Sequence, residues 1–143
     1  MKILVINGPN LNLLGEREPE IYGKETLNDC IDVVKKVLDT YSVEDFQSNS
    51  ESEIIDQIQN ARNNYDAIII NAGAFTHYSY AIRDALSMFE GKKIEVHLSN
   101  PHAREEFRHI SVISAVVDGV IAGFKKDSYE LAAIALKNMF EKN

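Results

Sequence analysis

Short apolar segments recur along this chain, and longer stretches with an apolar residue at every third or fourth position lie between them. Several of the short segments are continuous and rich in β-branched residues, which is typical of parallel strands that are covered on both faces. This pattern predicts strands at residues 3–6, 45–47, 67–70, 94–98 and 119–122.

Four of the longer stretches carry an apolar stripe at the spacing of a helix with one buried face. The stripes are Leu27, Ile31, Val34 and Leu38; Ile54, Ile55, Ile58 and Ala61; Ala81, Ile82, Ala85, Leu86 and Phe89; and Leu131, Ile134, Ala135 and Met139. Helix starts are indicated at Ser50 and Asp127, because a glutamate follows each of them three residues later. Strands that alternate with helices predict one α/β domain over residues 1–143, a flavodoxin-like, doubly wound, five-stranded parallel sheet.

The composition is that of a globular protein, with 45% hydrophobic and 26% charged residues. The formal net charge of −7 argues against a general affinity for nucleic acid or for an anionic membrane surface. No apolar run approaches the ~18 residues of a membrane span, and the first one is too short for a signal peptide. Cys30, the only cysteine, lies in an apolar stripe and is expected to be a core residue in a reducing compartment. We therefore expect a cytoplasmic protein.

Ligands of open α/β sheets bind beyond the carboxyl ends of the strands, so the segments after the first, third and fourth strands form the candidate site. Residues 7–15 hold three asparagines, Asn10 among them, but lack the glycine spacing of a phosphate loop; a plain strand exit is the alternative. Residues 15–25 are polar and contain two glycines, which is typical of a hinged lid; an ordinary solvated loop is the alternative. Arg17 and Tyr22 are its candidate functional residues, because a phenol becomes a base only where positive charge favours the phenolate.

Small and polar residues also follow the third strand. Asn71 ends this strand, and Thr76 and His77 precede a helix, which leaves room for a ligand close to the backbone. The alternative is that Thr76 caps the helix and His77 lies on its surface. Asp84 follows His77 by seven residues, so the two are expected two turns apart on one helix face.

A candidate acid lies on the fourth strand. Glu95, His97 and Ser99 share one face, because strand side chains alternate. A carboxylate beside the imidazole can orient it or favour its protonated form, and a purely structural histidine is the alternative. Beyond the strand, Arg104 and Arg108 would form a carboxylate clamp if their segment is helical; a solvated, salt-bridged turn is the alternative.

Other sites known on this architecture fit the sequence poorly. A signalling receiver domain needs acidic residues after the first strand and an aspartate after the third, where this chain has Asn7 and Asn71. A flavin carrier needs a loop rich in serine, threonine and glycine where this chain has Pro9 and leucines. The histidines, at 77, 97, 102 and 109, lack the spacing of metal-ligand pairs, so we expect neither a metal nor an organic cofactor. A metal-dependent lyase stays an alternative, which sensitivity to a chelator would reveal.

Five motifs, in matching order and spacing along almost the whole chain, resemble the type II 3-dehydroquinate dehydratase family. They are residues 8–15, Arg17-Glu18-Pro19 with Ile21-Tyr22-Gly23, Asn71 with residues 73–77, residues 95–100, and Arg104-Glu105 with Phe107-Arg108. The resemblance implies a cofactor-free enzyme of the shikimate pathway, usually assembled as a dodecamer built from trimers. The implied reaction is the reversible trans-dehydration of 3-dehydroquinate to 3-dehydroshikimate through an enolate.

The resemblance also implies roles for individual residues. Tyr22 matches the base, which acts as tyrosinate, and Arg17 matches the lid arginine that stabilises it. His97 matches the acid that protonates the departing hydroxyl, with Glu95 as its orienting partner. Asn10 matches the residue that holds a water on the enolate oxygen.

Positions that match substrate-binding residues are Asn71, His77, Asp84, Leu98, Ser99 and Arg108. Asp84 is implied to reach the site of a neighbouring subunit. The chain departs from the family pattern at Glu16, where a small polar residue is usual, at Ala72 and Pro101, and at Lys125-Lys126, which replace a glycine-containing turn. We expect Glu16 to alter lid motion or substrate affinity without abolishing activity, and the lysine pair to affect subunit packing.

Overall fold

The structure, a computed structural model, describes residues 1–142. Its centre is a parallel sheet with the strand order β2-β1-β3-β4-β5. The strands are β1 (Lys2–Asn7), β2 (Ser42–Gln47), β3 (Ala67–Asn71), β4 (Lys92–His97) and β5 (Gly119–Ala122). The chain changes winding direction between β1 and β3, which makes the sheet doubly wound in the flavodoxin-like order. The predicted fold class is therefore confirmed.

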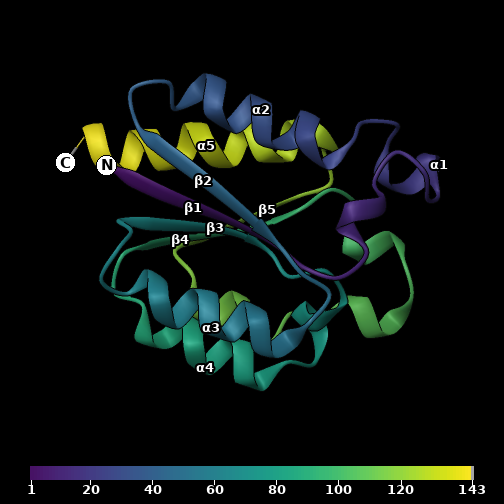
Figure 1. Cartoon of the computed structure of the whole chain (residues 1–143). Helices are drawn as coiled ribbons and strands as arrows, with labels where there is room; N and C mark the ends of the chain where they lie inside the picture. The colour runs from purple at the N-terminus through teal and green to yellow at the C-terminus, as the bar shows by residue number, and fades with distance from the viewer. Residues whose placement is uncertain (143) are drawn as a thin grey trace.

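Two layers of helices cover the sheet, as Figure 1 shows. Helices α2 (Leu27–Val37) and α5 (Lys126–Glu141) lie on one face, and α3 (Glu51–Ala61) and α4 (Tyr80–Met88) lie on the other. A single turn, α1 (Pro19–Tyr22), lies at the end of the sheet opposite to the chain termini. Short 3-10 helices occupy the loops, at Leu11–Leu13, Gly73–His77, Pro101–Ala103, Glu106–Arg108 and Ser114–Val116. In the described part of the chain, no helix is long and apolar enough to cross a membrane.

The central strands contribute side chains to two apolar layers, because successive residues point to opposite faces of the sheet. On β1, Ile3 packs with α2 and α5, whereas Leu4 packs with α3 and α4, and both are almost completely buried. Cys30 belongs to the first layer, as predicted. Its burial, together with the negative charge of Asp29, raises the pKa of the thiol to about 12.

Local hydrogen bonds define where the helices begin. Ser50 caps α3 as predicted, with its Oγ accepting from the Glu53 N–H at 3.3 Å. Thr26 forms a full capping box at the start of α2, which the sequence pattern did not single out. The cap predicted at Asp127 is wrong, because α5 begins at Lys126 and Asp127 lies inside its first turn.

The boundaries of β1 to β4 differ from the predicted ones by one to three residues, whereas β5 has its predicted bounds. β2 begins at Ser42, three residues before its predicted start. It is an edge strand with several exposed positions, so polar residues interrupt the apolar pattern on which the prediction depended. β4 ends at His97, so Leu98 already belongs to the loop that follows the strand.

Lys125, immediately before α5, has a strained backbone conformation. Its φ is 53° and its ψ is −134°, values that residues other than glycine rarely adopt and that cost roughly 1–3 kcal/mol. The conformation lets its N–H donate to the Leu98 carbonyl oxygen at 2.8 Å. The alkyl chain of Lys125 lies beside Gly23, where an added Cβ would approach it to 3.3 Å. Lys125 thus lies against the 15–25 loop.

Replacing Lys125 with glycine should raise the free energy of unfolding by about 1 kcal/mol. Relief of the backbone strain should exceed the ~0.5–1 kcal/mol that glycine costs in conformational entropy. Denaturant unfolding would measure the change, with Glu130→Gly, at an exposed position inside α5, as a control that should lower the stability. A loss of stability in Lys125→Gly would show that the contact with Gly23 outweighs the strain.

Candidate active site

A cavity opens at the carboxyl ends of β1, β3 and β4, at the end of the sheet where α1 lies (Figure 1). Its walls come from the turn after β1, the 15–25 loop and the segments that follow β3 and β4. The predicted site residues that line it are Asn10, Arg17, Tyr22, Asn71, His77, His97, Leu98, Ser99 and Arg108. The fold therefore brings most of the predicted site together in one place.

The hydroxyl of Tyr22 accepts hydrogen bonds from two guanidinium groups. Nη2 of Arg17 lies 2.8 Å from the hydroxyl oxygen, and Nη2 of Arg104 lies 2.6 Å from it. Both guanidinium groups also lie over the ring, at 4.3 and 4.9 Å from its centroid. Two cationic donors thus converge on one oxygen, at a place where they would stabilise negative charge.

The 15–25 loop is shaped by two glycines and one helical turn. Gly15 and Gly23 have φ values of 92° and 91°, which glycine adopts without strain. Between them, the Gly23 N–H closes the turn of α1 by donating to the Pro19 carbonyl oxygen at 2.8 Å. The Tyr22 side chain belongs to the apolar layer that includes Leu11 and is only 8% exposed. The core thus anchors the ring while the hydroxyl reaches the cavity.

His97, at the end of β4, contacts Glu95 as their shared strand face predicted. Nε2 of the imidazole is hydrogen-bonded to Oε2 of the carboxylate. Oε1 of Glu95 accepts from the hydroxyls of Ser111 and Ser114, at 3.3 and 2.6 Å. Burial alone would raise the pKa of Glu95, but the bonds from His97 and the two serines outweigh it, and the pKa lies below its ordinary value. An ionised Glu95 therefore holds the ring by Nε2 and leaves Nδ1 for a ligand in the cavity.

The lowered pKa of Glu95 predicts a pH-dependent contribution to stability. The ionised carboxylate stabilises the fold at pH values above the ordinary pKa of 4.5, and this contribution is lost as the pH falls through the lower pKa of the folded state. Urea unfolding of wild type and Glu95→Gln should therefore give a stability difference that shrinks by about 2 kcal/mol, the size of one charged hydrogen bond, between pH ~7 and pH ~3. A difference that stays constant over this range would contradict the assignment.

His77 presents a neutral imidazole to the cavity. Its Nδ1 lies 2.9 Å from the carbonyl oxygen of Ile110, so Nδ1 carries the hydrogen. Partial burial and the positive charges of His97 and Arg108 lower the pKa of His77, although the carbonyl contact opposes them. Nε2 can therefore accept a hydrogen bond from a ligand hydroxyl.

The turn after β1 is supported by polar residues that sequence reasoning did not single out. Asn10 has a left-handed backbone with a φ of 69°, and its N–H donates to Oδ1 of Asn49 at 2.9 Å. Gln47, the last residue of β2, donates to the Gly8 carbonyl oxygen at 3.1 Å. These side chains hold the turn from outside the cavity, so their effect on the site depends on tertiary contacts.

The predicted helical pairing of Arg104 and Arg108 is wrong. Two separate 3-10 helices, Pro101–Ala103 and Glu106–Arg108, occupy this segment. Arg104 turns to Tyr22 and to Oγ of Ser99, which is 3.2 Å away, whereas Nε of Arg108 lies 3.2 Å from Oε1 of Glu105. Sequence reasoning missed the contact between Arg104 and Tyr22, since these residues are 82 positions apart and no local spacing indicates it.

The predicted relation between His77 and Asp84 is also wrong. His77 ends a 3-10 helix, and α4 begins afterwards with Ser79 as its cap, so the two residues do not share a helix. Thr76 is buried inside the 3-10 helix and caps neither element. Asp84 lies on α4 outside the lining of the cavity. Within residues 1–142, no three histidine, cysteine, aspartate or glutamate side chains form a cluster that could hold a metal ion.

The chain matches known proteins over nearly its whole length. Residues 1–137 match the family model described as dehydroquinase class II. A 3-dehydroquinate dehydratase of Lachnoclostridium phytofermentans is 55% identical over 142 residues, which cover 97% of this chain and 98% of that protein. A crystal structure of a type II dehydroquinase from Butyrivibrio crossotus superimposes with a TM-score of 0.92 at 52% identity, covering 96% of this chain and 97% of that one. The corresponding enzyme from Propionibacterium acnes gives 0.89 at 45% identity, with 94% of each chain covered.

The fold, the cavity and these similarities together identify the chain as an α/β enzyme. The chain belongs to the class II dehydroquinase family. Its predicted function, that of a 3-dehydroquinate dehydratase of the shikimate pathway and hence a hydro-lyase, is confirmed.

Proposed function

We propose that this protein converts 3-dehydroquinate to 3-dehydroshikimate by reversible trans-dehydration through an enolate, using only its own side chains. The observation that carries this mechanism is the Tyr22 hydroxyl, which receives hydrogen bonds from Arg17 and Arg104 in the cavity that His97 also lines. An ionised phenol is a base, and an imidazole in the same cavity is a suitable acid. The dehydration of a hydroxyketone needs one of each.

In the first step, the Tyr22 phenolate takes a proton from the carbon next to the substrate ketone. The C–H electron pair becomes the enolate, whose negative charge needs a stabilising donor. We assign this task to a water held by Asn10, which lines the cavity in the turn after β1. Arg17 and Arg104 keep the phenolate stable until the proton arrives, because both donate to its oxygen.

In the second step, the enolate re-forms the ketone and expels the hydroxyl from the next carbon. Nδ1–H of His97 protonates the leaving oxygen, so that water departs and the new carbon–carbon double bond is conjugated with the ketone. Glu95 acts as the positioning residue, because it holds Nε2 of the same ring. Exchange with solvent then removes the proton from Tyr22 and returns one to His97.

The remaining cavity residues are assigned to substrate binding. Arg108 provides positive charge for the substrate carboxylate, although it also pairs with Glu105. Nε2 of His77 accepts a hydrogen bond from a substrate hydroxyl. Asn71 and the Leu98–Ser99 segment, which line the cavity, form further hydrogen bonds with the substrate.

We further propose that residues 1–143 form a single catalytic domain with a lid at residues 15–25, in a cytoplasmic dodecamer built as a tetramer of trimers. Large apolar side chains are exposed near α4 and around β5 and α5, which supports assembly. They are Tyr78, Tyr80, Met88, Val120, Phe124, Leu131 and Ile134. In such an assembly Asp84, on α4, would reach the cavity of a neighbouring subunit. Light scattering of the purified protein tests the predicted mass.

Ultraviolet absorbance tests the reaction directly, because the enone carboxylate of the product absorbs and the substrate does not. The purified protein should increase the absorbance when mixed with 3-dehydroquinate. Prior treatment with a chelator should leave the rate unchanged. Incubation with substrate and borohydride together, followed by an assay with fresh substrate, should also leave it unchanged, because borohydride inactivates the enzyme only if a lysine forms an imine with the substrate. Inhibition by the chelator would favour a metal-dependent lyase, and inhibition by borohydride would favour covalent catalysis.

A further inference from the structure

Two asparagines lie side by side at the point where the winding of the sheet reverses. Asn7 ends β1 and Asn71 ends β3, and the two are paired in the parallel register. Both are buried, with exposed fractions of 0% and 4%. Asn71 also lines the cavity, whereas Asn7 does not. The pair therefore connects the interior of the sheet to the wall of the candidate active site.

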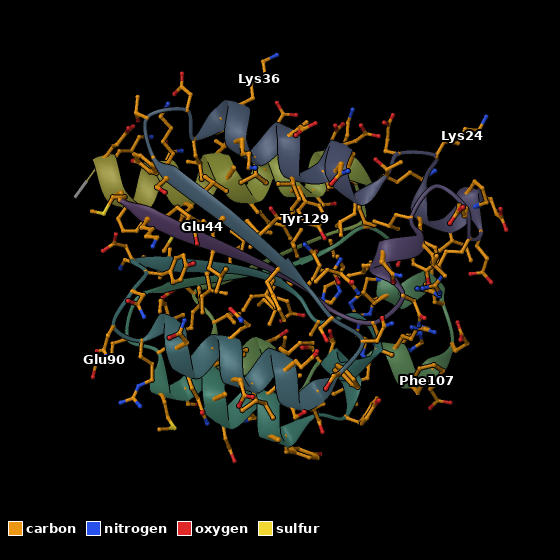
Figure 2. The ribbon with its side chains drawn as sticks, viewed as in Figure 1. Lys24, Lys36, Glu44, Glu90, Phe107 and Tyr129 are labelled. Carbon is orange, nitrogen blue, oxygen red and sulfur yellow. The ribbon has the colours of Figure 1, made fainter. Side chains whose placement is uncertain are left out.

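Tyr129, on α5, bridges these two asparagines. Its hydroxyl donates to Oδ1 of Asn7 and accepts from Nδ2 of Asn71 at 3.1 Å. The Tyr129 side chain is completely buried and lies between the α2–α5 layer and the sheet, as Figure 2 shows. Burial raises the pKa of Tyr129, so its hydroxyl keeps the hydrogen that it donates.

These bonds define which way the Asn71 amide faces. Its Nδ2 donates to Tyr129, and its Oδ1 accepts from the Gly73 N–H at 3.2 Å. A flipped amide would place its NH2 against the Gly73 N–H and its oxygen against a hydroxyl whose only hydrogen already goes to Asn7. Both contacts would be lost, so the second N–H of the amide keeps a defined direction for a ligand oxygen.

Asn7 gives an independent indication that this arrangement serves the site. Its Nδ2 is buried and has no hydrogen-bond partner within residues 1–142. A buried donor without a partner is destabilising, and such groups are rare in folded proteins. The loss of stability caused by the unpartnered Nδ2 has an explanation if Asn7 is needed for its Oδ1. This oxygen accepts the hydrogen of the Tyr129 hydroxyl and so directs it away from Asn71.

We propose that Tyr129 and Asn7 are positioning residues that fix the Asn71 amide so that it donates to an acceptor oxygen of the substrate. This inference rests on the proposed function, because it takes 3-dehydroquinate as the ligand of the cavity. Neither Tyr129 nor Asn7 touches the substrate; both act through Asn71. A hydrogen bond from Asn71 that is made equally to the substrate and to the transition state affects KM and not kcat. Removing Tyr129 or Asn7 should therefore raise KM and leave kcat nearly unchanged.

Steady-state kinetics of three variants test the proposal. Tyr129→Phe should raise KM for 3-dehydroquinate about tenfold, the effect of one hydrogen bond, with kcat within a factor of about three. The same substitution in an Asn71→Ala background should cause no further rise. Leu136→Ala, a buried change on the same helix, is the matched control and should lower the Tm without raising KM.

Asn7→Leu keeps the test decisive if Tyr129→Phe fails to fold. It removes the unpartnered amide but also the acceptor of the Tyr129 hydroxyl, so the two effects on the Tm should largely offset each other. KM should rise, because the Tyr129 hydroxyl becomes free to turn towards Asn71. An unchanged KM in either folded variant would overturn the proposal, and so would an equal rise of KM in the Asn71→Ala background. Failure of the proposed function is distinguishable, because wild type itself would then not turn over 3-dehydroquinate.

Discussion

Tyr22→Phe should reduce kcat for 3-dehydroquinate about a thousandfold, within the 10²–10⁴-fold range typical of a general base. The substitution removes the one oxygen that receives hydrogen bonds from both Arg17 and Arg104, while the ring stays in its apolar layer. Binding depends on other cavity residues, so KM should change little. Absorbance of the product measures both constants, and circular dichroism verifies that the variant is folded.

A control for this experiment is Tyr41→Phe, which removes a hydroxyl bonded to Glu141 on the far side of the chain from the cavity. Its activity should equal that of wild type. Arg104→Met is informative as well, because it removes one of two cationic donors and should cause a smaller loss than Tyr22→Phe. If Tyr22→Phe kept more than a tenth of the activity, another base would have to be sought.

His97→Ala should also lower kcat by about a thousandfold, since it removes the proton donor to the leaving hydroxyl. Such a loss corresponds to about 4 kcal/mol of transition-state stabilisation. Glu95→Gln should lower kcat less, because the neutral amide can still hold Nε2 of the ring but supplies no negative charge. Rapid-quench or steady-state absorbance measurements would determine both values.

His102→Ala is the matched control for His97, because His102 does not line the cavity with Tyr22. It should retain full activity. Equal losses in the two histidine variants would indicate a general structural effect and remove the argument for His97 as the acid. Partial recovery of His97→Ala by added imidazole would strengthen that argument.

The sequence predicts those parts of the structure whose cause is local. Continuous apolar, largely β-branched segments identify β1 and β3, and on β4 the alternation of strand side chains places Glu95 beside His97. Short motifs at strand ends likewise identify most residues of the cavity wall, because parallel strands bring their carboxyl ends to one edge.

The features that were missed depend on contacts between distant segments. Arg104 reaches Tyr22 across 82 positions, and its role is decided by how the loop after β4 folds into two short 3-10 helices instead of one α-helix. In the sequence, Tyr129 occupies an ordinary position of an amphipathic helix. In the structure, its hydroxyl bonds to Asn7 and Asn71 at the ends of β1 and β3. No periodicity encodes such a contact, because it follows from the packing of α5 against the sheet.

The burial of the only thiol makes the protein convenient for spectroscopic labelling. Cys30 is 1% exposed, and its raised pKa keeps it as the unreactive thiol, so alkylating dyes should leave the native protein unmodified. A cysteine introduced at the exposed Glu20 of α1 would then be the sole point of attachment for a fluorophore. The emission of that dye would report directly whether residues 15–25 move when substrate enters and product leaves.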